Sequence, residues 1–255
     1  MTRVDIDRLS TAERLLWGYG IVDPAQIDLD AVAFDQGAHV RYRNLDGCDA
    51  RLVVHGSKAI ISVNAQSREG RQRFSLGHEL AHWMCDRQRG SFMCAKEDIG
   101  PQNADAKTVE ANANAYASQL VLPDYLVLPR IENKPVSLDS AETLRKDFKS
   151  SLTAAAIKLV RKATIPSCVV RHSQSKREWF VTNLAFPFGL YVAREMHAES
   201  DGFALLYGTG NGMTRARREP ANRWLSGPGV FAMSVLAQSV KLPDQTVLSV
   251  ISIEG

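Results

Sequence analysis

Two histidines four residues apart, with a glutamate directly after the first, are the residues best suited to chemistry in this chain. They lie in the segment RQRFSLGHELAHW as His78, Glu79 and His82. Residues four apart on an α-helix share one face, so both imidazoles can reach one ion. Histidine binds Zn²⁺ at about 2.0–2.1 Å, and the glutamate beside the ligands can serve as a general base. The pattern predicts a catalytic zinc site; the alternative is a chance match on an amphipathic helix.

A catalytic zinc normally has three protein ligands and leaves the fourth position to water. The acidic candidates downstream of the histidines are Asp86, Glu97, Asp98, Asp105 and Glu110. Asp86 shares the helical face of His82 but lies one turn further along. Glu110 is the favoured ligand because alanine recurs at alternate positions from 111 to 117, and small side chains allow two helices to pack tightly. The alternative explanation of these alanines is their high helix propensity.

Three other polar residues are weaker candidates for the site. Asn114 lies four residues after Glu110 and shares its helical face, so it is the candidate for a hydrogen bond that orients a metal ligand. Tyr116 is turned about 240° from Glu110 on the helix, which favours core packing over stabilisation of an oxyanion. His172 follows a predicted strand, where a single histidine is more often structural.

The elements that must position these residues are three short strands followed by two helices. Short strands are predicted at 39–43, 50–55 and 59–64, followed by the helix of the histidine motif, a polar loop over 88–107 and the alanine-rich helix that ends at Pro123. After residue 164 the chain becomes strand-rich. We therefore expect an α+β fold with a first domain over 1–164, including two helices at 139–163, and a smaller strand-rich α+β domain over 165–255.

Composition narrows the class of protein. The chain has 255 residues and a formal net charge of +3, which is too small by itself to indicate nucleic-acid binding. The N-terminal segment lacks the apolar core of a signal peptide, and no apolar run approaches the roughly 18 residues of a membrane span. The four cysteines form no CxxC pair, which suits a reducing cytoplasm. Cys85 and Cys94 are expected to be buried thiols rather than a metal pair or redox switch.

The two separated motifs resemble those of the ImmA/IrrE family of metallopeptidases. In that family an HExxH helix precedes a helix of the form E-x-x-A-N-x-(F/Y)-A that ends in a leucine-rich stretch and proline; EANANAYASQLVLP, from Glu110 to Pro123, matches this form. The resemblance implies a zincin-like domain with a short antiparallel sheet, in which His78, His82 and Glu110 bind Zn²⁺ and Glu79 is the catalytic base. It also implies cleavage of a helix-turn-helix (XRE-type) transcriptional repressor, which induces stress-response or mobile-element genes.

Two basic segments leave alternatives open. The stretch 144–162 has the rhythm of a helix-turn-helix motif, but Ser151 and Thr153 are followed by alanines where a reading helix needs polar side chains. Packing against the zinc domain is therefore favoured over direct DNA binding. The arginine-rich stretch 214–229 is either a solvated face or a surface for an acidic substrate segment or nucleic acid.

Three functions compete on this evidence. The first is a zinc endopeptidase. The second is a regulatory protein that binds a repressor or DNA without cutting, and the third is a hydrolase with a different target, including a toxin-like role. The intact Glu79 favours an enzyme over the second function, because a metal site without catalysis needs no base. The strand-rich domain is expected to serve as a sensor or a substrate-docking surface.

Overall fold

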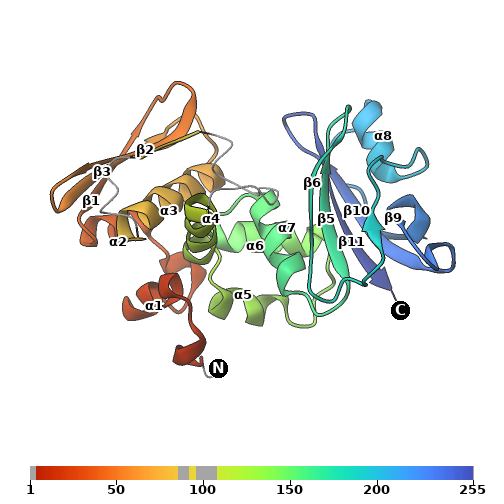
Figure 1. Ribbon diagram of the computed structural model, residues 1–255, viewed down its shortest axis with the longest axis horizontal. Helices are drawn as coiled ribbons and strands as arrows, with labels where there is room; N and C mark the ends of the chain where they lie inside the picture. Colours follow the sequence, from red (N-terminus) through yellow and green to blue (C-terminus); the bar gives the residue numbers. More distant parts are fainter. Residues whose placement is uncertain (1–3, 86–91, 96–107, 255) are drawn as a thin grey trace. The chain divides into compact units, whose positions relative to one another are not determined.

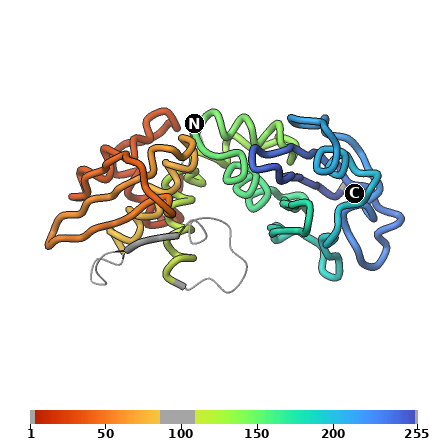
Figure 2. The backbone as a smooth tube through the Cα atoms, turned by 90° about the horizontal axis from the view of Figure 1, so that it is seen from above, coloured from red at the N-terminus to blue at the C-terminus, as the bar shows by residue number. Residues whose placement is uncertain are grey.

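The computed structural model describes residues 4–85, 92–95 and 108–254, and its contacts divide the chain into two compact units. Unit 1 consists of Met1–Arg130 and Leu144–Ser151, and unit 2 consists of Ile131–Thr143 and Leu152–Gly255 (Figures 1 and 2). This division by contacts passes through a helix, α6 (Leu138–Phe148). A domain boundary at residue 164 stays a prediction. The mixed α+β architecture is as expected.

The sheet of unit 1 has four strands in the order β1-β3-β2-β4. Their bounds are β1 Ala38–Arg43, β2 Cys48–His55, β3 Lys58–Asn64 and β4 Phe92–Ala95. β1 and β3 are parallel, whereas β2 is antiparallel to both β3 and β4. The expectation of an antiparallel sheet was therefore wrong for the pair β1 and β3. The β2–β3 hairpin reverses the chain and places β3, not β2, beside β1, so that these two strands run in the same direction.

The fourth strand lies in a stretch that was expected to be a loop. β4 has only four residues, and such a short segment shows no measurable periodicity of two. Pairing with β2 fixes it as the edge strand of the sheet. Tertiary hydrogen bonding thus decides the conformation here, where local sequence could not.

The helices of unit 1 include the helix of the histidine motif and the alanine-rich helix, as predicted. They are η1 (Ile6–Arg8), α1 (Thr11–Gly18), η2 (Pro24–Gln26), α2 (Leu29–Asp35), α3 (Glu69–Cys85), α4 (Thr108–Val121) and α5 (Asp124–Ile131). α1 begins after a side-chain cap: the Ser10 hydroxyl accepts from the Glu13 amide at 3.3 Å, and the Glu13 carboxylate accepts from the Ser10 amide at 2.9 Å. This reciprocal pair is a capping box.

Two glycines in α3 allow close approach of other backbone. A Cβ at Gly70 would lie 2.4 Å from the carbonyl carbon of Ser150 and 2.4 Å from the amide nitrogen of Ser151. A Cβ at Gly77 would lie 3.5 Å from Cα and Cβ of Ala117 on α4. The first contact is possible only without a side chain, and the second is an ordinary van der Waals distance. Both fix the position of α3 within unit 1.

The sheet of unit 2 is wholly antiparallel, in the order β6-β5-β11-β10-β8. Its strands are β5 (Ser167–His172), β6 (Arg177–Thr182), β8 (Arg217–Pro220), β10 (Ser234–Lys241) and β11 (Val247–Glu254). β10 and β11 run side by side in Figures 1 and 2. A separate two-stranded ribbon pairs β7 (Tyr191–Val192) with β9 (Leu225–Ser226). Unit 2 also contains helix α8 (Asp201–Tyr207) and the short 3-10 helices η4 (Ala221–Arg223) and η5 (Val230–Ala232).

The helix α7 (Leu152–Lys162) packs on this second sheet, against β5, β6 and β11. Its buried face includes Ala155, Ala156 and Leu159. The expectation that the stretch 144–162 packs against the zinc domain was therefore wrong for α7, whereas residues 144–151 belong to unit 1. The alanines of α7 instead form the apolar stripe that covers the sheet of unit 2.

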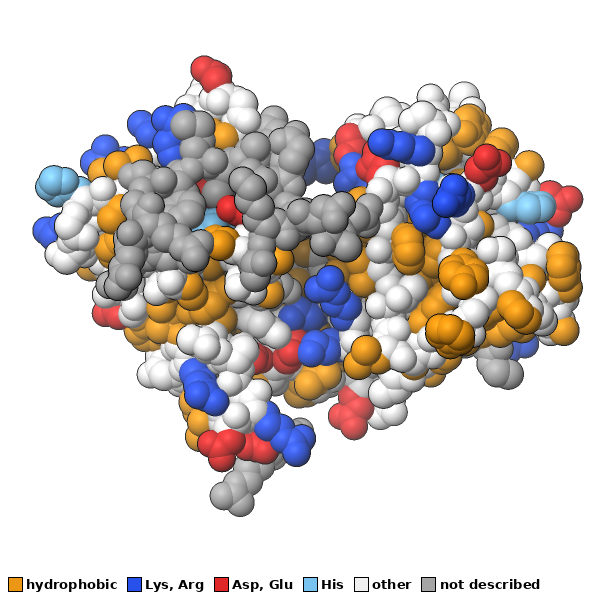
Figure 3. All heavy atoms as spheres, viewed as in Figure 1, with side chains coloured by type: hydrophobic (Ala, Val, Ile, Leu, Met, Phe, Trp, Pro, Cys, Tyr) orange, Lys and Arg blue, Asp and Glu red, His pale blue; other side chains and the backbone are white. Residues whose placement is uncertain are grey.

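Unit 2 also exposes large apolar side chains. Leu184, Phe188 and Phe231 have relative exposures of 105%, 106% and 85%, and Figure 3 shows several apolar side chains gathered on the visible face of this unit. Cys168 lies fully buried in the same unit, as Cys48 does in unit 1. Cys85, which was expected to be buried, is exposed at the end of α3.

Candidate metal centre

The candidate metal centre is built from one face of α3 and the first turn of α4. His78 and His82 lie one helical turn apart on α3, and both side chains have 0% exposure. Glu110 stands in the first turn of α4, and its side chain is 17% exposed. The two helices pack closely where Gly77 meets Ala117. The small residues of α4 therefore bring Glu110 within reach of the histidines, as the alanine pattern predicted.

Three ligand atoms converge at this place. Nε2 of His78 lies 3.1 Å from Nε2 of His82 and 3.2 Å from Oε2 of Glu110. Nε2 of His82 lies 3.4 Å from the same carboxylate oxygen. The three residues thus form a nearly equilateral triangle of two imidazole nitrogens and one carboxylate oxygen.

The size of this triangle fits a tetrahedral zinc ion. Two ligand atoms that each lie about 2.0–2.1 Å from a tetrahedral ion are separated by about 3.3 Å, which matches the edges of 3.1–3.4 Å. Three electron-rich atoms held this close in a buried place repel one another unless a cation or proton lies between them. The donor set of two histidines and one carboxylate is also one that catalytic zinc uses.

Burial keeps the first histidine in the form that binds metal. It lowers the pKa of His78 to about 3, with a further lowering by the neighbouring His82, so the ring is neutral at physiological pH. Nδ1 of His78 lies 3.1 Å from Oδ1 of Asn114. A proton on Nδ1 is donated to that oxygen, which leaves the lone pair of Nε2 directed at the cluster. Asn114 therefore orients His78, as its position on the helical face suggested.

The other candidate residues are not members of the triangle. Glu79 follows His78 on α3 and has 0% exposure, but it is not one of the three converging residues. The Tyr116 hydroxyl donates to the sulfur of Met84 at 3.4 Å, and burial raises the pKa of Tyr116 to about 12. His172 belongs to β5 of unit 2. Asp86, Glu97, Asp98 and Asp105 lie outside the described residues.

One charged group near the centre was not anticipated from the sequence. Arg71 lies on α3 seven residues before His78, and its Nε and Nη2 donate to the same carboxylate oxygen of Asp49 at 3.0 and 2.6 Å. Asp49 is only 4% exposed and accepts a further hydrogen bond from Ser67 at 3.0 Å. The charge of Arg71 contributes to the low pKa of His78. The signal available in the sequence was the spacing of seven residues between Arg71 and His78, since residues two helical turns apart lie on the same face of a helix.

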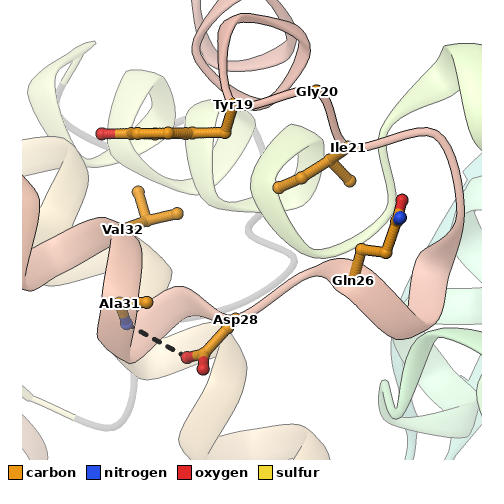
Figure 4. Close-up of a pocket in the computed structure, with 7 residues that line it drawn as sticks. All are labelled: Tyr19, Gly20, Ile21, Gln26, Asp28, Ala31 and Val32. Carbon is orange, nitrogen blue, oxygen red and sulfur yellow. Dashed lines mark hydrogen bonds between the residues drawn. The ribbon is translucent and has the colours of Figure 1, made fainter.

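A cavity of about 240 Å³ elsewhere in unit 1 is distinct from this centre. It is lined by Tyr19, Gly20, Ile21, Gln26, Asp28, Ala31 and Val32 (Figure 4). Its polar side chains have structural roles: Asp28 accepts from the Ala31 amide at the start of α2, and Gln26 accepts from the Val22 and Asp23 amides. The cavity therefore offers no evident chemistry.

Acidic residues neutralise part of the arginine-rich stretch. Arg217 pairs with Asp201 at 2.5 Å and with Glu219 at 3.3 Å. Arg223 pairs with Glu199 at 2.6 Å. These ion pairs favour a structural, solvated face over a surface that receives nucleic acid.

Across the described residues, every helix falls short of the length and hydrophobicity that a membrane span requires.

No curated protein matches the chain. A solved structure described as a Mycobacterium tuberculosis transcriptional regulator is similar with a TM-score of 0.65 and 14% sequence identity; the match covers 98% of this chain and 76% of that chain. At this identity the likeness concerns the fold alone. The family described as the IrrE N-terminal-like domain matches residues 33–160, about half of the sequence, and the chain therefore belongs to the ImmA/IrrE family.

Proposed function

We propose that this chain is a zinc-dependent endopeptidase whose metal is held by His78, His82 and Glu110. The observation that carries this proposal is the convergence of their three ligand atoms, with separations of 3.1–3.4 Å that suit one zinc ion. Membership of a family of peptidases supports it. When bound, zinc would supply a Lewis acid for the scissile carbonyl and lower the pKa of a water.

Two residues of the chain would orient a ligand and transfer protons in this reaction. Asn114 fixes the ring orientation of His78 through Nδ1. Glu79 lies about 100° around α3 from His78, and its carboxylate would accept the proton of the attacking water and deliver it to the leaving amine. Burial of the two histidines and Glu79 lowers the local dielectric constant and strengthens each electrostatic interaction there.

The proposed substrate is a helix-turn-helix (XRE-type) transcriptional repressor in the cytoplasm, whose cleavage induces stress-response or mobile-element genes. The family resemblance carried by the two motifs supports this, and the description of the structurally similar protein as a transcriptional regulator is compatible with it. The strand-rich part, residues 165–255, is proposed to be a sensor or a docking surface for the substrate. Direct DNA binding is not favoured, because α7 buries its alanine face against a sheet.

A cleavage assay tests the proposal. Purified protein with zinc is incubated with the helix-turn-helix repressor encoded nearest its gene, beside Glu79→Gln and Glu110→Ala. We expect a discrete fragment from the unaltered protein only. Glu79→Gln should retain zinc by metal analysis, since it keeps all three ligands, whereas Glu110→Ala should lose most of its metal affinity.

Three results would count against this proposal in different ways. Full zinc content in Glu110→Ala would remove Glu110 from the ligand set. An intact repressor that co-purifies with the protein would indicate a regulator that binds without cutting. An intact repressor that does not bind would place the substrate elsewhere.

A further inference from the structure

Two arginines of unit 2, Arg177 and Arg194, lie close together and have no acidic partner among the described residues. Arg177 begins β6, and its Nη1 donates to the carbonyls of Val192 at 2.5 Å and Ala193 at 3.3 Å. The guanidinium therefore lies against the backbone that leads directly into Arg194. The two positive charges interact, since Arg194 adds to the effect of burial in lowering the pKa of Arg177. Within the described ranges neither arginine forms an ion pair with Asp or Glu.

A β-bulge creates this concentration of charge. The pairing of β5 with β6 shifts between Arg171 and His172, so that Arg177 rather than Glu178 stands opposite His172. A regular ladder would continue from the pair Arg171–Trp179 to place Glu178 there. The Glu178 carboxylate instead pairs with Arg171 at 2.9 Å. The bulge thus exchanges an acidic side chain for a basic one beside His172.

Arg177 is held in a fixed orientation with donors to spare. Its Cζ lies 4.5 Å from the centroid of the Phe180 ring, and one of its terminal nitrogens is bound to the two carbonyls. In the described part of the chain, Nε and Nη2 of Arg177 form no hydrogen bond. A guanidinium presents planar, paired donors that match an oxyanion. Orienting it in advance reduces the entropic cost of binding such a ligand.

A buried histidine lies beside the arginine pair. His172 is 3% exposed, and neither ring nitrogen makes a well-formed hydrogen bond. Burial and the charge of Arg177 lower the pKa of His172 to about 4, while the nearby backbone of Arg194 opposes this shift. Buried polar atoms are rarely left unsatisfied. The His172 ring thus has only a weak contact with the Arg194 backbone and lies beside the charge of Arg177, which a bound anion would offset.

Three other arginines of unit 2 differ from this pair because each forms ion pairs with acidic residues. Arg171 binds Asp244 as well as Glu178, and Arg217 and Arg223 each bind carboxylates. Among the described residues, Arg177 and Arg194 form no such ion pair, and Arg194 is exposed.

We propose that Arg177 and Arg194, supported by His172, form a binding site for a small oxyanion, either a phosphate group or a carboxylate carried by a small ligand. Arg177 supplies the preoriented donors, and the exposed Arg194 closes on the anion from the other side. The bound charge offsets the repulsion between the guanidinium groups. This site belongs to unit 2 and does not depend on the peptidase activity.

Calorimetric titration of the full chain with inorganic phosphate and with succinate, at constant ionic strength set by chloride, tests the site. We expect saturable binding to the unaltered protein and an affinity about tenfold lower in Arg194→Ala, which removes a charge-assisted contact. Arg194 is exposed, so the variant should fold normally. Arg215→Ala is the matched control, since it removes another exposed arginine of unit 2 and should bind as the unaltered protein does.

Phosphate and succinate are compared by their affinities. The anion that binds more tightly indicates whether the natural ligand carries a phosphate or a carboxylate group. Nuclear magnetic resonance of the His172 ring gives a second readout: a bound anion should raise its pKa in the unaltered protein but not in Arg194→Ala. Failure of both anions to bind saturably would overturn the proposal. Equal losses in Arg194→Ala and Arg215→Ala would do so as well, because they would indicate a general effect of net charge.

Discussion

At the scale of single residues, Asn114 is the group whose contribution to the metal centre is most open to test. Its Oδ1 lies 3.1 Å from Nδ1 of His78. Removing such an orienting contact typically lowers metal affinity by about 10–100-fold. We therefore expect Asn114→Ala to bind zinc more weakly by this amount when measured by competition with a chelator.

Asn114→Asp is the matched variant, because it retains an acceptor oxygen at the same position. Its zinc affinity should be at least that of the unaltered protein, since a carboxylate also raises the basicity of the histidine. Equal weakening in Asn114→Ala and Asn114→Asp would show that the residue acts through packing alone.

His172 makes the stability of unit 2 depend on pH. Its pKa is lowered from 6.5 to about 4 in the folded state, so below pH 6.5 the unfolded chain binds a proton that the folded chain does not. The free energy of unfolding should therefore decrease as the pH falls through this window, by at most about 3 kcal/mol. Denaturant unfolding at several pH values in phosphate-free buffer measures it.

His172→Phe provides the reference, because it cannot titrate. The variant should lose this part of the pH dependence of unfolding, whatever its stability at neutral pH. An unchanged dependence between pH 6.5 and 4 in His172→Phe would assign the effect to other groups.

At the scale of elements, alanine substitutions at the two glycines of α3 should change the free energy of unfolding in opposite directions. At Gly70 a Cβ would approach the backbone of Ser150 and Ser151 to 2.4 Å, and this backbone cannot rotate away as a side chain could. We expect Gly70→Ala to lower the free energy of unfolding by about 1–3 kcal/mol or more. At Gly77 the nearest atoms lie at 3.5 Å, so alanine should stabilise the helix by up to about 1 kcal/mol.

Denaturant unfolding of both variants measures this contrast, and each serves as the control for the other. Similar changes in the two variants would mean that α3 does not approach the 150–151 backbone as closely as described. Gly77→Ala should also retain zinc, since Ala117 leaves room for the new methyl group.

The sequence predicted elements well where a local pattern is strong. Ser10 and Glu13 specify the start of α1 through a reciprocal cap, and the alanines of α4 predicted its close packing on α3. It could not predict β4, which depends on pairing with β2, or the parallel arrangement of β1 and β3. The bulge that sets Arg177 opposite His172 is likewise a property of the paired strands, and neither strand carries a signal for it.

At the scale of the whole molecule, the chain has two units, each with a sheet of its own. The proposed zinc ligands all belong to unit 1. Zinc should therefore stabilise unit 1 by about 2.7 kcal/mol at a free concentration one hundred times the Kd. Differential scanning calorimetry should show one transition that moves to lower temperature on chelation and another that does not.

Glu110→Ala is the control for this experiment, because it should remove the response to chelator while leaving the second transition in place. A single transition that shifts as a whole would show instead that the two units unfold together.

The buried cysteines give each unit its own chemical reporter. Cys48 lies in the sheet of unit 1 and Cys168 in that of unit 2, and both thiols are buried. Burial raises the pKa of Cys168 to about 12, so almost no reactive thiolate forms at neutral pH. An alkylating reagent can modify either residue only when its strand opens. Peptide mass spectrometry after timed alkylation would therefore record the opening of the two sheets separately, in one sample and without an engineered reporter residue.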